Sequence, residues 1–336
     1  DRSIAEIRHL TVTGNNLSDE NLVDIRNSQF NIKNISLSES GRHGLNLEHS
    51  NGHLDNISIQ NSNKSGLNID GSNLNLETGD IQGSAENGIE IRNNSSLRGG
   101  WKNQEDTSLP QYMISVKSST RSGIYISSNS LVELENIQIE NNKDGINVEK
   151  NSSLRLKSSL ITLNNDDGID GDKIVLIDLE DTIVSNNGDD GIDVSKNSFL
   201  RLIKSDILTN NDKGIDISRN SQLEIISSNI SLNQNNGIGI YNNSILTFEK
   251  WDEFNENTVI SNNNSEGLQS SNNVQILFDS DLGIQFEGNN GSINLGENTY
   301  MSVEGNITTD EEMSCWNFYS KDPNNLDIIQ QSNKPI

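Results

Sequence analysis

The chain has 336 residues, a formal net charge of −25 at pH 7, and a hydrophobic content of only 31%. Such an acidic surface disfavours nucleic acid and anionic membranes as partners, and no apolar run is long enough to span a bilayer. The single cysteine, Cys315, excludes a disulfide framework within the chain.

A tetrad of the form G-[IL]-x-[ILV] recurs along the chain and predicts a short strand every 22 or 23 residues. Successive intervals between its glycines are 22, 22, 35, 22, 23, 23, 23, 23 and 30. Leu22 fits the same register without a glycine, and G-I-Q-F at Gly283 extends it loosely. The regular tetrads begin at Gly44, Gly66, Gly88, Gly123, Gly145, Gly168, Gly191, Gly214, Gly237 and Gly267.

Residues 191–213 illustrate one repeat. Alternating apolar residues predict a strand at 192–194 and a second at 200–202, and Ile207 predicts a short third strand. S-K-N-S (195–198) and T-N-N-D-K (209–213) are typical turns. Such a coil cannot bury its apolar residues alone, so we expect successive coils to stack in parallel, with equivalent residues ~4.8 Å apart.

The tetrad, the N-S turn that follows it and the x-N-N-x-x closure resemble the right-handed parallel β-helix repeat family, which has the pectin-lyase-like fold. The resemblance covers roughly residues 20–300. It implies an all-β, single right-handed parallel β-helix of about eleven coils over residues 21–304. We expect an N-terminal cap in residues 1–20 and a C-terminal cap or tail in residues 305–336, with Cys315 buried there.

Aspartates gather at equivalent positions of neighbouring coils and make a candidate cation site. Unit charges ~4.8 Å apart repel by about 1 kcal/mol in water, so such a cluster either recruits a cation or is tolerated by solvent and nearby lysines. Carboxylates suit Ca²⁺, which takes six to eight oxygen ligands. The candidate ligands are Asp166, Asp167, Asp170, Asp189, Asp190 and Asp193.

The same aspartates offer a catalytic alternative. N-N-D-D-G (164–168) and N-G-D-D-G (187–191) resemble two polygalacturonase motifs, which would give catalytic roles to Asp167, Asp189 and Asp190. The family's next motif, G-H-G, is D-K-G here (212–214), and its R-x-K motif is absent. A lyase would instead need a basic residue, for which Lys196 and Arg219 are candidates.

Two insertions interrupt the repeat after the second strand of a coil, at residues 99–110 and 251–257. They carry Trp101 and Trp251, and Tyr125 occupies an outward position of its tetrad. Loops on rigid scaffolds carry function disproportionately. These three aromatic residues are therefore the candidate glycan-binding residues, although each tryptophan can equally anchor its own loop.

Three functions remain open. We favour an extracellular or surface-exposed rod, adhesin-like or tail-fibre-like, that spaces or binds glycans without catalysis and carries Ca²⁺ on its acidic face. The alternative is a secreted polysaccharide lyase or glycoside hydrolase acting on an acidic polysaccharide at the aspartates of residues 168–216. The third is a purely structural repeat of a larger assembly, such as a trimer.

Overall fold

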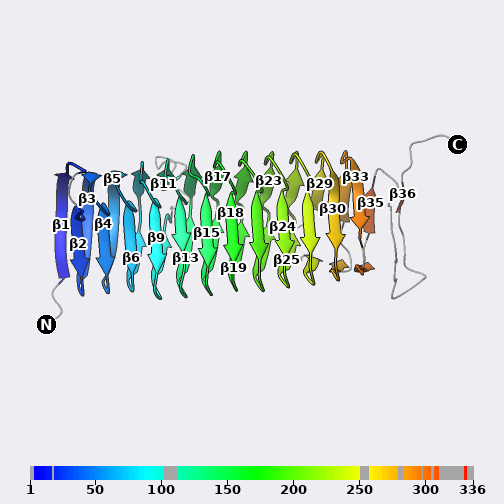
Figure 1. Ribbon diagram of the computed structural model, residues 1–336, viewed down its shortest axis with the longest axis horizontal. Coiled ribbons are helices and arrows are strands. Elements are labelled where there is room, and N and C mark those ends of the chain that lie inside the picture. The colour runs from blue at the N-terminus through cyan, green and yellow to red at the C-terminus, as the bar shows by residue number, and fades with distance from the viewer. Residues whose placement is uncertain are drawn as a thin grey trace. The chain divides into compact units, whose positions relative to one another are not determined.

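The computed structural model describes residues 4–16, 19–101, 112–249, 257–278, 283–296, 298–303, 306–309 and 329–330. It divides into two compact units, residues 1–170 and 171–336. Every regular element in the described ranges is a β-strand (Figure 1). None of these ranges contains a helix with the length and apolarity needed to cross a membrane.

The predicted coil of three strands is confirmed. In the repeat at residues 191–213 the strands are β21 (Ile192–Ser195), β22 (Phe199–Ile203) and β23 (Asp206–Leu208). Strands of successive turns pair in parallel and in register, with Ile192 opposite Ile215 and Leu200 opposite Leu223. The solenoid has about twelve turns, close to the eleven expected from the tetrads.

In unit 1 the tetrads form one parallel sheet. Its strands are β2 (Val23–Arg26), β4 (Leu45–Glu48), β6 (Leu67–Asp70), β9 (Ile89–Arg92), β12 (Ile124–Ile126) and β15 (Ile146–Glu149). The second and third strands of each turn are β3 (Gln29–Ser40), β5 (Asn51–Ser62), β7 (Asn73–Leu76), β8 (Gly79–Gln82), β10 (Ser96–Gly99), β11 (Ile114–Lys117), β13 (Leu131–Glu135), β14 (Ile137–Glu140), β16 (Ser153–Lys157) and β17 (Leu160–Thr162). β18 (Ile169–Asp172) spans the division between the units.

Unit 2 repeats this arrangement. Its tetrad strands after β21 are β24 (Ile215–Ser218), β27 (Ile238–Tyr241), β30 (Glu266–Ser271) and β33 (Gly291–Leu295). The other strands, besides β22 and β23, are β19 (Leu176–Glu180), β20 (Ile183–Ser185), β25 (Gln222–Ile226), β26 (Asn229–Ser231), β28 (Ile245–Glu249), β29 (Thr258–Ser261), β31 (Gln275–Phe278), β32 (Gly283–Glu287), β34 (Tyr300–Val303), β35 (Asn306–Thr309) and β36 (Ile329–Gln330).

The register expected at Gly283 is wrong. The strand that starts there, β32, pairs with β29, which is a third strand of its turn. The next tetrad strand is β33, which pairs with β30. The G-I-Q-F sequence imitates a tetrad because both kinds of strand alternate apolar and polar residues.

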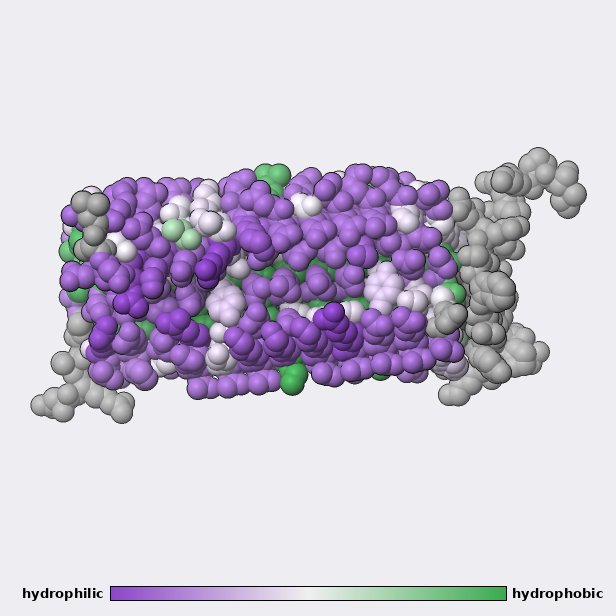
Figure 2. All heavy atoms as spheres, viewed as in Figure 1, coloured by the Kyte–Doolittle hydropathy of each residue, from purple (hydrophilic) through white to green (hydrophobic). Residues whose placement is uncertain are grey.

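The core consists of the inward residues that the tetrad pattern predicts. Ile192, Val194, Leu200, Leu202 and Ile207 are fully buried. Outward side chains alternate with them, so the surface visible in Figure 2 is mostly hydrophilic. This explains how a chain with little hydrophobic sequence folds, because each coil needs only a few apolar residues once its neighbours cover it.

Serine ladders occupy the turns after most of the tetrad strands. In unit 2 the Ser198 hydroxyl oxygen accepts a hydrogen bond from the Val175 N–H (3.1 Å), and Ser221 accepts one from the Ser198 N–H (3.2 Å). In unit 1, Ser72 accepts in the same way from Ser50 (2.9 Å). Each serine thereby satisfies a buried backbone N–H of the preceding turn.

An asparagine ladder runs along a second corner of unit 2. The Asn233 side-chain oxygen accepts hydrogen bonds from the Asn210 backbone (3.0 Å) and side-chain amides (3.0 Å). The Asn233 side-chain amide donates to the Ile207 carbonyl (3.2 Å) and to the Asn263 side-chain oxygen (2.9 Å). Asn233 is fully buried, so both ends of its amide are bonded inside the solenoid.

The predicted terminal caps are described only in part. β1 (Ile4–Thr13) pairs in parallel with β3, and β36 pairs with β35. Cys315 and Trp251 lie outside the described residues. The roles of residues 1–20 and 305–336 as caps therefore stay predictions.

Replacing Asn233 with alanine tests the asparagine ladder. The change leaves buried backbone groups without partners, and we expect it to lower the free energy of unfolding by about 2–4 kcal/mol. Asn211→Ala is the matched control, because this exposed side chain makes only one hydrogen bond, to the Gly188 carbonyl. Denaturant unfolding of the two variants measures the difference, and equal stability would contradict a structural role for the ladder.

Candidate functional site

A groove of about 670 Å³ lies on the outer face of β9, β12 and β15 in unit 1. Tyr125, at the centre of β12, is flanked in register by Glu90 on β9 and Asn147 on β15. Strand alternation points these three side chains outward while Ile124 and Ile126 fill the core. The groove is lined by Glu86, Asn87, Glu90, Arg92, Arg121, Ser122, Tyr125, Ser127, Ser128, Lys143, Asp144, Asn147 and Lys150.

The Tyr125 ring is half-buried, and its hydroxyl group has an acidic partner. This hydroxyl donates a hydrogen bond to Glu149 Oε2 (3.3 Å), and Lys150 Nζ lies 3.2 Å from the same oxygen. A phenol held in this way offers an apolar ring to a ligand while its polar end remains satisfied. Tyr125 thus occupies the outward position that the tetrad pattern predicts, and its role in glycan binding stays a prediction.

One side of the groove is fixed by an arginine between two carboxylates. Arg92 Nη1 lies 2.8 Å from Glu90 Oε1, and Arg92 Nε lies 3.0 Å from Asp70 Oδ2. Glu90 is a buried residue, and its other oxygen, Oε2, accepts a hydrogen bond from the Ser65 hydroxyl (2.6 Å). These pairs hold donors and acceptors in fixed positions along the groove wall.

Lys143 and Asp144 form the opposite side. Lys143 Nζ lies 2.9 Å from Asp166 Oδ2 and 3.2 Å from Asp144 Oδ1. The hydrogen bond to Asp166 is the main reason that the pKa of Lys143 rises to about 12. Burial raises the pKa of Asp144, and the positive charge of Lys143 opposes this shift. Lys143 therefore stays protonated at neutral pH and acts as a fixed cation.

Trp101 borders a separate depression of about 570 Å³ in unit 1. The side chain is 52% exposed, so it is not folded fully onto the solenoid as an anchor. The lining residues come from β5, β7 and β10 and are Asn51, Gly52, Asn73, Leu74, Asn75, Ser96, Arg98 and Trp101. The other candidate tryptophan, Trp251, is outside the described residues, so its role in glycan binding stays a prediction.

Unit 2 carries a different charged cluster on its tetrad sheet, centred on Lys213. Lys213 Nζ lies 3.0 Å from Asp216 Oδ2 and 3.3 Å from Asp212 Oδ2. It is 3.7 Å from Asp190 Oδ2, and the backbone N–H of Lys213 donates to Asp190 Oδ1 (2.8 Å). The attraction of these carboxylates raises the pKa of Lys213 although burial opposes it.

Asp190 is the unusual acid of this cluster. It is only 7% exposed, and burial raises its pKa to about 7, while Lys213 acts in the opposite direction. Its neighbour Tyr241 extends over Gly239, where an added Cβ would lie 2.6 Å from the tyrosine oxygen. Burial raises the pKa of Tyr241 to about 12. Its hydroxyl donates to Gln269 Oε1 (2.9 Å).

The predicted calcium ligands fall in both units. Asp166 is paired with Lys143, and Asp170 accepts a hydrogen bond from the Asn147 amide (2.7 Å). In unit 2, carboxylate oxygens of Asp189, Asp190 and Asp212 lie within 4.8 Å of one another. Asp167, just before a tetrad, and Asp193, within one, are both partly exposed. Ca²⁺ binding by these carboxylates stays a prediction, and Lys213 already supplies a positive charge beside two of them.

The candidate basic residues of the catalytic alternative are also placed by the structure. Lys196 Nζ lies 2.8 Å from Asp172 Oδ2, and Lys173 Nζ lies 2.9 Å from the same oxygen. The hydrogen bonds from these lysines lower the pKa of Asp172 although burial opposes the shift. Arg219 is exposed and has no ion pair among the residues described here. Lys196 therefore serves as an ion-pair partner in this structure.

Several groove residues were missed by sequence reasoning. The charged residues chosen from the sequence were the aspartates after residue 165 and the basic residues near them. Arg121 and Lys143 lie two residues before the glycines of their coils, and extending this position to the coils before residue 165 would have placed both beside Tyr125. Residue type alone did not show that Glu90 and Asp144 are buried, because their burial depends on the side chains of the adjacent coils.

Comparison with known proteins identifies the fold. Residues 122–281 match a family described as the right handed beta helix region. The chain has the right-handed β-helix fold. The comparison with curated protein sequences finds no match.

Two solved structures share this β-helix fold at low sequence identity. The A-module of the Azotobacter vinelandii mannuronan C-5 epimerase AlgE4 is 12% identical, with a TM-score of 0.57, over 88% of this chain and 90% of that one. The periplasmic alginate epimerase AlgG is 13% identical, with a TM-score of 0.55, over 85% of this chain and 79% of that one. Both likenesses concern the fold.

The raised pKa of Asp190 predicts a pH-dependent stability. A carboxyl whose pKa is higher in the folded protein than in the unfolded chain binds more protons when folded between about pH 4 and 7. Asp190 contributes fully to the free energy of unfolding in acid. This contribution is lost as the pH rises through 7, and the loss is at most about 4 kcal/mol.

Asp190→Asn stays neutral at every pH and keeps an acceptor for the Lys213 N–H. We therefore expect its melting temperature, relative to the unsubstituted protein, to rise between pH 4 and pH 8. Asp189→Asn, at the exposed neighbouring position, should show a smaller trend. Parallel melting curves across pH for the unsubstituted protein and Asp190→Asn would contradict a proton on Asp190.

Proposed function

We propose that this β-helix is an extracellular or surface-exposed protein that binds a glycan, without catalysis, in the groove around Tyr125. The observation that carries the proposal is the groove itself, which is concave, contains a half-buried aromatic side chain and is lined by oriented donors and acceptors. Its volume lies in the range of ~300–1,000 Å³ found for small-molecule sites. The similar solved structures, whose names describe epimerases of alginate and mannuronan, support a carbohydrate ligand.

The charges of the groove favour binding over chemistry. Lys143 is held protonated by two carboxylates, so it cannot accept a proton at neutral pH. Glu90 is engaged by Arg92 and Ser65. A general base or nucleophile needs a free lone pair within reach of the substrate. The charged groups therefore suit hydrogen bonding to hydroxyl and carboxylate groups of a sugar chain.

Substitution of Tyr125 tests this proposal. Tyr125→Ala removes the ring that a pyranose would cover, and we expect an affinity loss of about tenfold or more. Tyr125→Phe keeps the ring and should lose less. The matched control is Tyr300→Ala, an exposed tyrosine of unit 2. Calorimetric titration with defined oligosaccharides of alginate, pectate and a neutral glucan provides the measurement, and no loss in Tyr125→Ala would exclude the groove as the site.

A second candidate function is polysaccharide cleavage at the Asp190 cluster of unit 2. The observation that favours it is a carboxyl with a pKa of about 7 within 4.8 Å of another carboxylate, Asp212. A glycoside hydrolase needs one protonated and one ionised carboxyl, and differing environments can supply this pair. A polysaccharide lyase at the same acidic face is the related alternative.

Product assays separate this candidate from binding alone. Because we favour binding, we expect neither new reducing ends nor the absorbance of an unsaturated uronate when the protein is incubated with alginate, pectate or glycosaminoglycans. Product formation that disappears in Asp190→Asn but persists in Tyr125→Ala would instead establish the cleavage function in unit 2.

A further inference from the structure

A line of basic residues crosses successive turns of unit 1 at the corner that precedes the tetrad sheet. The Lys64 N–H donates to the Arg42 carbonyl (2.9 Å), and the Lys143 N–H donates to the Arg121 carbonyl (2.9 Å). Between them, Glu86 is bonded to Lys64 (3.4 Å) and Arg121 (3.0 Å) through the backbone. We call Arg42, Lys64, Arg121 and Lys143 the basic stripe. At one strand spacing per turn it is roughly 20 Å long.

Most of the stripe has no acidic partner. Within the described residues, Arg42, Lys64 and Arg121 form no ion pair, and only Lys143 does so. Elsewhere most described lysines and arginines pair with carboxylates, as expected for a chain with net charge −25. Arg42 and Lys64, which are one strand spacing apart and have no ion pair among the described residues, repel one another by about 1 kcal/mol even in water. Their alignment therefore opposes folding slightly, and a bound anion would offset this cost.

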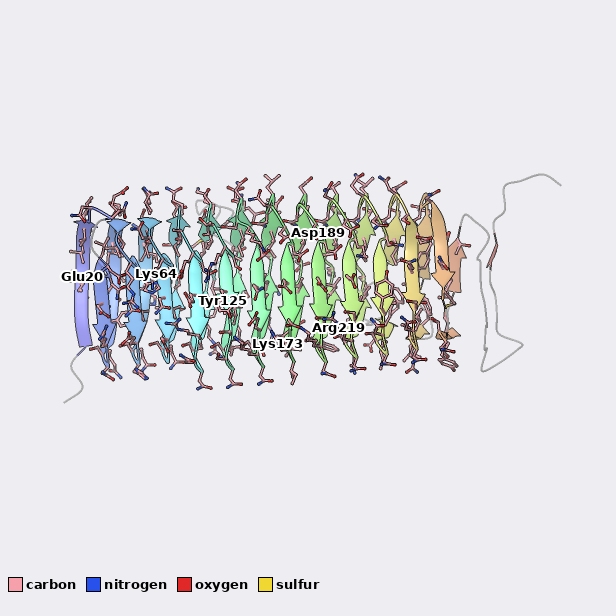
Figure 3. All side chains as sticks on the ribbon, in the orientation of Figure 1. Glu20, Lys64, Tyr125, Lys173, Asp189 and Arg219 are labelled. Carbon is pink, nitrogen blue, oxygen red and sulfur yellow. The ribbon has the colours of Figure 1, made fainter. Side chains whose placement is uncertain are left out.

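The stripe continues into the proposed glycan groove. Arg121 and Lys143 belong to both, and Glu86 lines the groove as well. Figure 3 shows Lys64 and Tyr125 on the same face of unit 1. A ligand that covers Tyr125 can therefore extend along the stripe toward Lys64 and Arg42 without leaving the surface.

The charge pattern also determines how a bound polymer would be oriented on the surface. Along the stack, the cations form two neighbouring pairs, Arg42 with Lys64 and Arg121 with Lys143, and Glu86 lies between the pairs. Along the chain, each cation is followed within a few residues by a buried acid or polar group, such as Asp144 after Lys143 and Ser122 after Arg121. A linear polymer that meets successive cations must therefore lie parallel to the stack of turns. An extended pyranose chain has a repeat of comparable length.

We propose that the basic stripe binds a linear polyanion, a carboxylated or sulfated polysaccharide, lengthwise over the turns from Arg42 to Lys143. This assignment of ligand class rests on the proposed function of the Tyr125 groove. The polymer places its anionic groups on the guanidinium and ammonium groups and one sugar ring over Tyr125. Charge-assisted hydrogen bonds from arginine to carboxylate or sulfate give the contact its strength.

The experiment compares polyuronate, a sulfated glycosaminoglycan and a neutral glucan of matched length, titrated into the full chain at several salt concentrations. We expect both polyanions to bind at least tenfold more tightly than the glucan. Their affinity should fall with salt, as it does wherever fixed cations displace counterions. The double variant Lys64→Ala/Arg121→Ala should lose about tenfold or more and show a shallower salt dependence. Arg155→Ala, which removes an exposed arginine that pairs with Glu133 outside the stripe, is the control and should bind normally.

The outcomes distinguish the two proposals. Equal binding of glucan and polyanions, unaffected by the double variant, overturns the stripe and leaves the glycan groove intact. Polyanion binding that needs the stripe but is unchanged in Tyr125→Ala supports the stripe and overturns the groove. Binding of none of the three polymers overturns both. Equal affinity for single-stranded DNA of the same charge would overturn the polysaccharide class of ligand.

Discussion

Hydrogen bonding between identical corners of successive turns is the constraint on which the structure depends. A turn of a solenoid leaves backbone N–H groups inside the corner, away from water, where an unpaired group costs about 1–3 kcal/mol. Buried serines satisfy these groups in one corner and buried asparagines in another, as Ser198 and Asn233 show in unit 2. Each side chain bonds the neighbouring coil, so the corner can form only when coils are stacked. The high content of serine and asparagine, which resembles a disordered composition, is thus part of the buried structure.

The same corners require a backbone conformation that few residues adopt. In the turns after the tetrad strands from β9 to β30 two successive residues have positive φ, such as Lys196 (60°) and Asn197 (62°). Asparagine tolerates this region better than most residues, which explains the recurring N-S sequence. Ile174 departs from the pattern, since a β-branched residue takes the second position with φ of 64° and is 58% exposed. The surrounding ladder imposes the conformation there, against a local preference of about 1–2 kcal/mol.

The sequence contained most of the fold because periodicity, and not the identity of single residues, determines it. Glycine, two apolar residues and a turn signal defined three strands per coil, and the structure places Ile192, Leu200 and Ile207 inside as expected. The pattern failed at Gly283, where a third strand imitates a tetrad. Side-chain chemistry was less predictable. Asp167 and Asp190 occupy the same position of the repeat, but only Asp190 is buried, beside Lys213 of the next coil. Such differences depend on which side chain the adjacent coil contributes, and a local motif does not contain that information.

Stacking also explains how chemistry can be confined to part of a repetitive molecule. Packing and hydrogen bonding constrain the inward positions and the corner ladders in every coil. An outward side chain needs only to fit beside the equivalent side chains of the two adjacent coils. A change at one outward position therefore has a local effect, and a run of similar changes produces a continuous surface. The position two residues before the glycine carries Arg121 and Lys143 in unit 1 and Asp189 and Asp212 in unit 2, on the same backbone conformation. Screening limits the influence of each such surface to roughly 8–10 Å at physiological salt. A strongly acidic protein can consequently present a locally basic surface to an anionic ligand, because the ligand responds to the nearest charges and not to the net charge of the chain.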